Sequence, residues 1–106
     1  MAERVSAADF DEKVLRSEIP VAADFYSDSC IPCKRLSPVI SRLEEEFSGR
    51  VKFVKVNVNF DGELAERFDV LAAPTIVFFR DGSETGRTRG AVTQQELTDA
   101  VEELIK

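Results

Sequence analysis

The sequence predicts an α/β layer fold with a mixed central sheet. The chain has 106 residues, the size of one ordinary domain. Its hydrophobic fraction of 43% and charged fraction of 32% are typical of a globular protein with a buried core. The hydrophobic period alternates several times between helical and strand spacing, as expected for helices packed on a sheet. We therefore expect a single domain over residues 1–106.

The first half of the chain predicts a helix, a strand and a longer helix. Ser6 can cap the first helix, which Pro20 blocks from continuing. The inner face of that helix is expected to comprise Ala7, Phe10 and Val14. Residues 21–26 then predict a strand. A second helix follows the two cysteines and ends near Gly49, where a left-handed residue is favoured. Its apolar positions are Leu36, Val39, Ile40, Leu43 and Phe47.

The second half predicts two further strands, a hairpin and a closing helix. Residues 51–58 carry apolar side chains at both odd and even positions, which indicates a central strand covered on each side. Asp61 can cap a short helix, and residues 75–79 predict a strand that turns at residues 81–82 into a polar partner. Thr93 and Glu96 form a capping box for the last helix. The apolar side of that helix comprises Leu97, Val101, Leu104 and Ile105.

Charge and composition disfavour several classes of function. Fourteen Lys and Arg against twenty Asp and Glu give a net charge of -6, which repels nucleic acids and anionic lipid surfaces. The longest apolar run is far below the roughly 20 residues needed to cross a bilayer. Histidine is absent, which removes the commonest general base and the usual imidazole metal ligand. The N-terminus lacks a secretory pattern, so we expect a cytoplasmic protein. An acidic single domain without an obvious apolar patch is expected to be a monomer, without nucleic-acid or membrane partners.

Both cysteines lie in one Cys-x-x-Cys run between a predicted strand and the start of a predicted helix. At a helix N-terminus, free amides and the helix dipole stabilise a thiolate and lower the thiol pKa. Cys30 is therefore the expected nucleophile. Cys33 lies one turn further along, where it is expected to be more buried and to resolve a mixed disulfide. Pro32 fits the first turn without loss of a hydrogen bond and stiffens the loop between the sulfurs.

Two structural interpretations compete with a redox dithiol. A disulfide staple across so short a loop removes little chain entropy, and a reducing cytosol opposes it. A structural zinc ion needs about four ligands, whereas this chain offers two cysteines and no histidine. The strand-then-helix context favours the redox dithiol, and we expect no metal.

Asp24 and Lys55 introduce charges into two apolar strands. Each is costly if buried alone, and we expect neighbouring strands to bring them into an ion pair beneath the helix that carries the cysteines. A half-buried carboxylate with a raised pKa suits proton transfer, so one hypothesis is that Asp24 accepts and returns the Cys33 proton. The alternative is a structural pair that fixes strand register.

Pro74 also allows two interpretations. A proline at the first residue of a strand is permitted. The sharper hypothesis is a cis peptide bond between Ala73 and Pro74, because cis bonds are nearly confined to proline and mark tight turns.

Over essentially its whole length the sequence resembles thioredoxins. The residues that carry the resemblance are Asp24-Phe25-Tyr26, Cys30-Ile31-Pro32-Cys33-Lys34, Pro38, Lys55-Val56-Asn57-Val58, Ala73-Pro74-Thr75, Phe79-Arg80-Asp81-Gly82 and Arg89-Gly90-Ala91. The resemblance implies a thioredoxin fold, with a mixed four- or five-stranded sheet flanked by about four helices. It also implies that Cys30 attacks, that Cys33 resolves, and that the Asp24–Lys55 pair handles protons.

The resemblance further implies where partners dock. Pro74 is expected in cis beside the sulfurs, with Ala73 pairing its main chain with an extended substrate segment. Gly90 and Ala91 belong to the same apolar rim, and Ile31 and Pro32 complete the expected substrate-binding set. Two departures stand out: Ser29 replaces the usual active-site tryptophan and Ile31 the usual glycine. These changes bear on reduction potential and on partner choice.

The expected function is reduction of protein disulfides through a Cys30/Cys33 dithiol–disulfide cycle. No dinucleotide fingerprint is present, so the redox-active disulfide is the only expected redox group. Electrons must then come from a thioredoxin reductase or an equivalent enzyme, and the partners are disulfide-containing client proteins. Two alternatives are a specialised redoxin with a dedicated reductase and a non-enzymatic thioredoxin-fold subunit.

Overall fold

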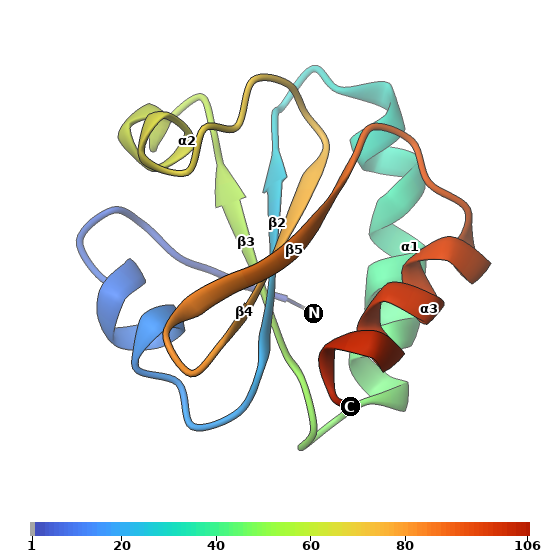
Figure 1. Cartoon of the computed structure of the whole chain (residues 1–106). Helices are drawn as coiled ribbons and strands as arrows, with labels where there is room; N and C mark the ends of the chain where they lie inside the picture. Colours follow the sequence, from blue (N-terminus) through green and yellow to red (C-terminus); the bar gives the residue numbers. More distant parts are fainter. Residues whose placement is uncertain (1) are drawn as a thin grey trace.

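The computed structural model describes residues 2–106 and contains a five-stranded mixed sheet with helices on both faces (Figure 1). In chain order the elements are β1 (Glu3–Arg4), the π-helical turn η1 (Asp11–Leu15), β2 (Val21–Tyr26), α1 (Ile31–Glu46), β3 (Lys52–Asn57), α2 (Gly62–Arg67), β4 (Thr75–Arg80), β5 (Ser83–Arg89) and α3 (Gln94–Leu104). The strand order is β1-β3-β2-β4-β5. Strands β1, β3 and β2 run parallel, and β4 and β5 are antiparallel to their neighbours. The predicted fold class is confirmed.

Two apolar layers sandwich the sheet. Helices α1 and α3 cover one face, and η1 and α2 lie on the other (Figure 1). The alternation of β2 divides its side chains between these layers: Ala22 packs under α1, while Ala23 and Phe25 join the opposite layer. Asp24 shares the parity of Ala22. The sheet therefore presents Asp24 to the helix that begins with the cysteines.

The predicted first helix is shorter than expected. Its start was assigned to Ser6, but the amide and hydroxyl of Ser6 both donate to the carboxylate of Asp9, at 2.7 and 3.1 Å. This closes a turn, and the helical residues begin only at Phe10. Phe10 and Val14 are buried as predicted, while Ala7 is partly buried.

Strand β1 was not predicted, and it adds the fifth strand at the edge of the sheet. It pairs with β3, and the amide of Val5 extends the pairing by donating to the carbonyl of Lys55 at 2.9 Å. Strand β3 is consequently an interior strand, as predicted, although the middle strand of the five is β2.

Local capping chemistry sets the N-termini of α1 and α3. Cys30 is the N-cap of α1, and Gly49 adopts a positive φ of 82° beyond its end. The predicted capping box of Thr93 and Glu96 is present at α3. Asp61 precedes α2 as predicted, but its carboxylate accepts from the amide of Ala7 at 3.1 Å and does not cap the helix.

Among residues 2–106, no helix is long and apolar enough to cross a bilayer.

The β4–β5 hairpin turns at Asp81 and Gly82, which both have positive φ, the conformation of a tight type I′ turn. A Cβ added to Gly82 lies 3.1 Å from the carbonyl oxygen of Leu15. We expect Gly82→Ala to lower the free energy of unfolding by about 1–3 kcal/mol. The alanine would be held in a left-handed conformation, and its Cβ would press against the Leu15 carbonyl. Urea unfolding measures the change.

Gly62→Ala is the matched control for that prediction. Gly62 has open space around its Cβ position and no positive φ. Its replacement should leave the free energy of unfolding unchanged or slightly higher. Equal losses in the two variants would show that the hairpin turn has no special need for glycine.

Candidate active site

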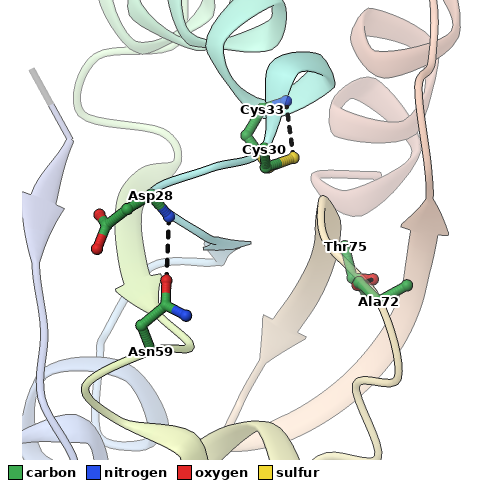
Figure 2. The surroundings of a disulfide bond; sticks show 6 residues. All are labelled: Asp28, Cys30, Cys33, Asn59, Ala72 and Thr75. Atoms are coloured by element: carbon green, nitrogen blue, oxygen red, sulfur yellow. Dashed lines mark hydrogen bonds between the residues drawn. A yellow bond between two sulfur atoms is a disulfide. The ribbon is translucent and has the colours of Figure 1, made fainter.

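The two cysteines lie at the first turn of α1 and form a disulfide (Figure 2). Cys30 is the N-cap, with an extended backbone, and its Sγ accepts a hydrogen bond of 3.1 Å from the amide of Cys33. Pro32 occupies the first turn, as predicted. In the reduced protein this amide and the helix dipole favour a negative charge on the Cys30 sulfur.

The two sulfurs differ in accessibility. Cys33 is 6% exposed, whereas Cys30 is half-buried and is flanked by exposed Ser29 and Ile31. An approaching disulfide therefore reaches Cys30 first. The Cα atoms of Cys30 and Cys33 are 5.2 Å apart, within the usual disulfide range, so Cys33 can close onto Cys30 without rearrangement of the helix.

A buried asparagine anchors the segment that leads into the site. Asn57, at the end of β3, is 2% exposed, and its Nδ2 donates to the carboxylate of Asp28 at 3.0 Å. The amide of Asp28 in turn donates to Oδ1 of Asn59 at 3.0 Å (Figure 2). These bonds hold the residues just before Cys30 against the neighbouring strand. Sequence reasoning missed this contact, although asparagine in an apolar strand is itself an unusual feature.

Asp24 and Lys55 lie directly opposite each other in the β2–β3 register. Both line a cavity of about 220 Å³ together with Cys33. The structure thus places the buried cysteine and the two charged residues on one cavity. It does not form the expected ion pair, however: among residues 2–106 no salt bridge joins Asp24 and Lys55, and Oδ1 of Asp24 has no hydrogen-bond partner. Lys55 also places its Nζ 5.7 Å from the centre of the Tyr26 ring, a favourable cation–π arrangement.

The Asp24 carboxyl is buried and its pKa is raised. Its Oδ1 is fully buried and, among the described residues, has no hydrogen-bond partner. Burial raises the pKa of Asp24 to about 7, against an opposing influence from the positive charge of Lys55. A second cavity of about 30 Å³, lined by Asp24, Ser37 and Ser41, adjoins it and is large enough for a water molecule.

The segment before β4 forms a rim beside the site. The Ala73–Pro74 peptide bond is cis, as hypothesised. The carbonyl of Pro74 accepts from the amide of Gly90 at 2.8 Å, and the hydroxyl of Thr75 donates to the carbonyl of Ala72 at 2.7 Å. Ala72 and Thr75 are drawn in Figure 2. Leu71, which sequence reasoning did not single out, is 91% exposed.

A shallow cavity of about 150 Å³ lies beside the start of α1. Pro32 and Ala91 both line it, with Arg35 as the charged residue on its wall. Ile31, 62% exposed, stands next to Pro32. Four of the predicted client-contacting residues thus lie in two pairs. A hydrogen bond links Pro74 with Gly90, and one cavity is lined by both Pro32 and Ala91.

The described residues offer no metal centre. Within residues 2–106, no group of three or more His, Cys, Asp or Glu side chains is arranged to hold a metal ion. The chemistry that this site can perform with its own groups is exchange between a dithiol and a disulfide, with a carboxyl beside the buried sulfur.

Comparison with known proteins agrees with this chemistry. The thioredoxin family model matches residues 1–103. "Probable thioredoxin-2" of Caenorhabditis elegans is 38% identical over 94% of this chain and 69% of its own length. "Thioredoxin 1" of Synechococcus elongatus is 33% identical over 96% of this chain and 95% of its own length.

A plant relative is longer than this chain. "Thioredoxin M-type, chloroplastic" of Spinacia oleracea is 36% identical over 95% of this chain, which spans only 56% of that protein. The family model nevertheless matches nearly all of the present sequence, and the disulfide lies at the start of α1. This chain belongs to the thioredoxin family, whose members are thiol–disulfide oxidoreductases.

Proposed function

We propose that this protein reduces disulfide bonds in client proteins and is itself re-reduced by a separate reductase. The observation that carries the proposal is the unequal accessibility of the two bonded cysteines: Cys33 is buried, whereas Cys30 is half-buried at the N-terminus of α1. The more accessible cysteine, whose thiolate is stabilised, attacks, and the buried cysteine resolves.

In the first step the Cys30 thiolate attacks one sulfur of the client disulfide. A bond forms between Cys30 and that sulfur, and the client's other sulfur leaves as a thiolate and takes a proton. In the second step the Cys33 thiolate attacks Cys30, which releases the client's second thiol. The client disulfide gains two electrons and two protons, and the protein is left with the Cys30–Cys33 disulfide.

Asp24 is the proposed proton acceptor for Cys33. The two residues line one cavity, and a carboxyl with a pKa of about 7 can take up and return a proton near neutral pH. Lys55 limits the rise in the pKa of Asp24 and is the second member of this proton-handling pair.

The client is proposed to lie across the rim formed by Ala73 and Pro74. An extended client segment pairs with the main chain of Ala73, while Gly90 and Ala91 provide apolar contact on the far side. Ile31 and Pro32 contact the residues next to the client's disulfide. The exposure of Ile31 and the hydrogen bond from Gly90 to Pro74 support this arrangement.

Electrons are proposed to come from a thioredoxin reductase or an equivalent enzyme. Ser29 and Ile31 both lie exposed where that enzyme must approach the disulfide, so a dedicated reductase is the main alternative partner. We further propose a monomer that works in a reducing compartment such as the cytoplasm, because reductant must keep the dithiol available.

Cys33→Ser tests the order of the two steps. Without the resolving thiol, the mixed disulfide between Cys30 and insulin should accumulate instead of decaying, because only an external thiol can release it. Mass spectrometry under non-reducing conditions detects the adduct. The native chain should show almost none, and a Cys33→Ser protein that releases reduced insulin at the native rate would contradict the proposed resolving role.

A further inference from the structure

The C-terminal end of α2 carries an uncommon backbone conformation close to the client-docking rim. Phe68 is the C-cap, and Asp69 follows with a positive φ of 58°. The amide of Val70 donates back to the carbonyl of Ala65 at 2.7 Å. This is a Schellman-type end, in which glycine normally occupies the left-handed position. Asp69 therefore holds a conformation that disfavours a side chain.

Arg87, on β5, compensates for that helix end. Its Nη2 donates to the carbonyl of Phe68 at 2.8 Å and its Nη1 to the carbonyl of Asp69 at 3.4 Å. These carbonyls lie at and beyond the helix end, where no further helical turn can supply amide partners. The guanidinium thus ties β5 to the end of α2.

Glu84 fixes the orientation of this guanidinium. Nε and Nη2 of Arg87 donate to the two carboxylate oxygens of Glu84 at 2.7 and 2.6 Å. The arginine side chain is only 12% exposed, and its hydrogen bonds hold the pKa of Glu84 below the usual range. A bidentate contact of this kind restricts both the position and the plane of the guanidinium.

The anchored helix end leads directly into the rim. Only residues 70–72 separate Asp69 from Ala73, and Leu71 and Ala72 in that segment are exposed. The far end of the segment is fixed by the hydroxyl of Thr75 on the carbonyl of Ala72. The near end is fixed by Arg87, so the segment is held at both ends while its middle is free to meet a partner.

We propose that Arg87 is a positioning residue for client recognition, acting through the end of α2 on the rim that contains Ala73. This inference rests on the proposed function, because it assumes that protein clients dock on that rim. It assigns Arg87 no part in the chemistry of the sulfurs. Arg87 should therefore matter for large protein disulfides and be dispensable for small ones.

The test compares two substrates that share the chemistry and differ in docking. Prereduced protein is mixed with insulin or with oxidised glutathione, exchange is stopped by alkylation, and mass spectrometry gives the second-order rate constants. Arg87→Met keeps the aliphatic stem and removes the guanidinium. We expect it to lower the insulin rate constant about tenfold, equivalent to 1.4 kcal/mol, and to leave the glutathione rate constant unchanged.

Two further variants make the comparison specific. Arg50→Met removes an exposed arginine that also donates to a helix-end carbonyl, that of Glu46 at 3.2 Å, but at the far end of α1, so both of its rate constants should stay native. Arg87→Lys keeps the charge but cannot span Glu84 and two carbonyls. It should fall between native and Arg87→Met on insulin, and it serves as the second variant if Arg87→Met does not fold.

The outcomes separate this inference from the proposed function. Equal changes of both rate constants in the Arg87 variants, or no change in either, would overturn the positioning role while leaving the dithiol mechanism standing. If native protein reacts with glutathione but not with insulin, client reduction and the positioning role both fail. A selective loss on insulin supports the inference.

Discussion

Replacing Cys30 with serine should reduce the rate of insulin reduction to that of dithiothreitol alone. A serine hydroxyl is not ionised near neutral pH and cannot form the mixed disulfide, so neither step of exchange can proceed. Serine is itself a preferred N-cap residue, so it can accept from the amide of Cys33 as the native sulfur does. The variant therefore removes the chemistry and keeps the helix start. The measurement is insulin precipitation under dithiothreitol.

The control for this prediction is Ser48→Ala, which alters an exposed residue at the far end of α1 and should reduce insulin at the native rate. A Cys30→Ser protein that matched the native rate would show that turnover does not pass through this sulfur. If the Cys30→Ser protein reduced no insulin but still performed the protein's biological role, the chain would instead be a thioredoxin-fold subunit that acts by binding through its surface.

The elements that sequence reasoning predicted well are those fixed by local interactions. The capping box of Thr93 and Glu96 links residues three apart, and the apolar stripe of α1 repeats every helical turn. The Asp81-Gly82 turn depends on two backbone conformations that its own residues favour. Each signal lies within a few residues, so it can be read before the tertiary structure is known.

The elements that were missed depend on distant partners. Strand β1 is two exposed polar residues, and its extended state comes from pairing with β3, about 50 residues away. Ser6 was expected to cap a helix, but the carboxylate of Asp9 accepts from its hydroxyl and amide. A helix capped by Ser6 and a turn closed by Asp9 satisfy the same local rules, so the sequence alone could not choose between them.

The same distinction holds within the site. The disulfide between Cys30 and Cys33 was predictable from their spacing at a helix start. For Pro74 the residues alone left a cis bond and a simple strand start open, and the resemblance to thioredoxins favoured the cis bond. The facing of Asp24 and Lys55 followed from strand parity. The hydrogen bond from Asn57 to Asp28 spans 29 residues, and that from Arg87 to Phe68 spans 19 residues. Their geometry arises only when strands and helix ends are already packed.

Asp24→Asn should make the protein more stable at neutral and alkaline pH. Burial raises the pKa of the native carboxyl from 3.8 to about 7, so between these values the folded protein holds a proton that the unfolded chain has lost. The native free energy of unfolding therefore falls as pH rises through this window. At 1.36 kcal/mol per pKa unit, the full difference is up to about 4 kcal/mol.

The Asp24→Asn variant has no ionisable carboxyl at this position, so it avoids the cost of burying a charge there. Its advantage over the native protein should be small near pH 4, grow towards pH 7 and level off above it. Urea unfolding of the oxidised proteins across this range measures the difference without interference from cysteine titration. Ser48→Ala, which removes no ionisable group from the exposed surface, is the control and should show a difference that does not vary with pH.

The stabilising substitution should at the same time impair the reaction. Asparagine cannot accept the Cys33 proton, so resolution of the mixed disulfide should slow by about a hundredfold. Its rate should also lose the inflection near pH 7 that the native carboxyl imposes. A variant more stable yet slower shows that the buried charge is retained for proton transfer. A variant more stable with native kinetics would leave Asp24 only the role of fixing the register between β2 and β3.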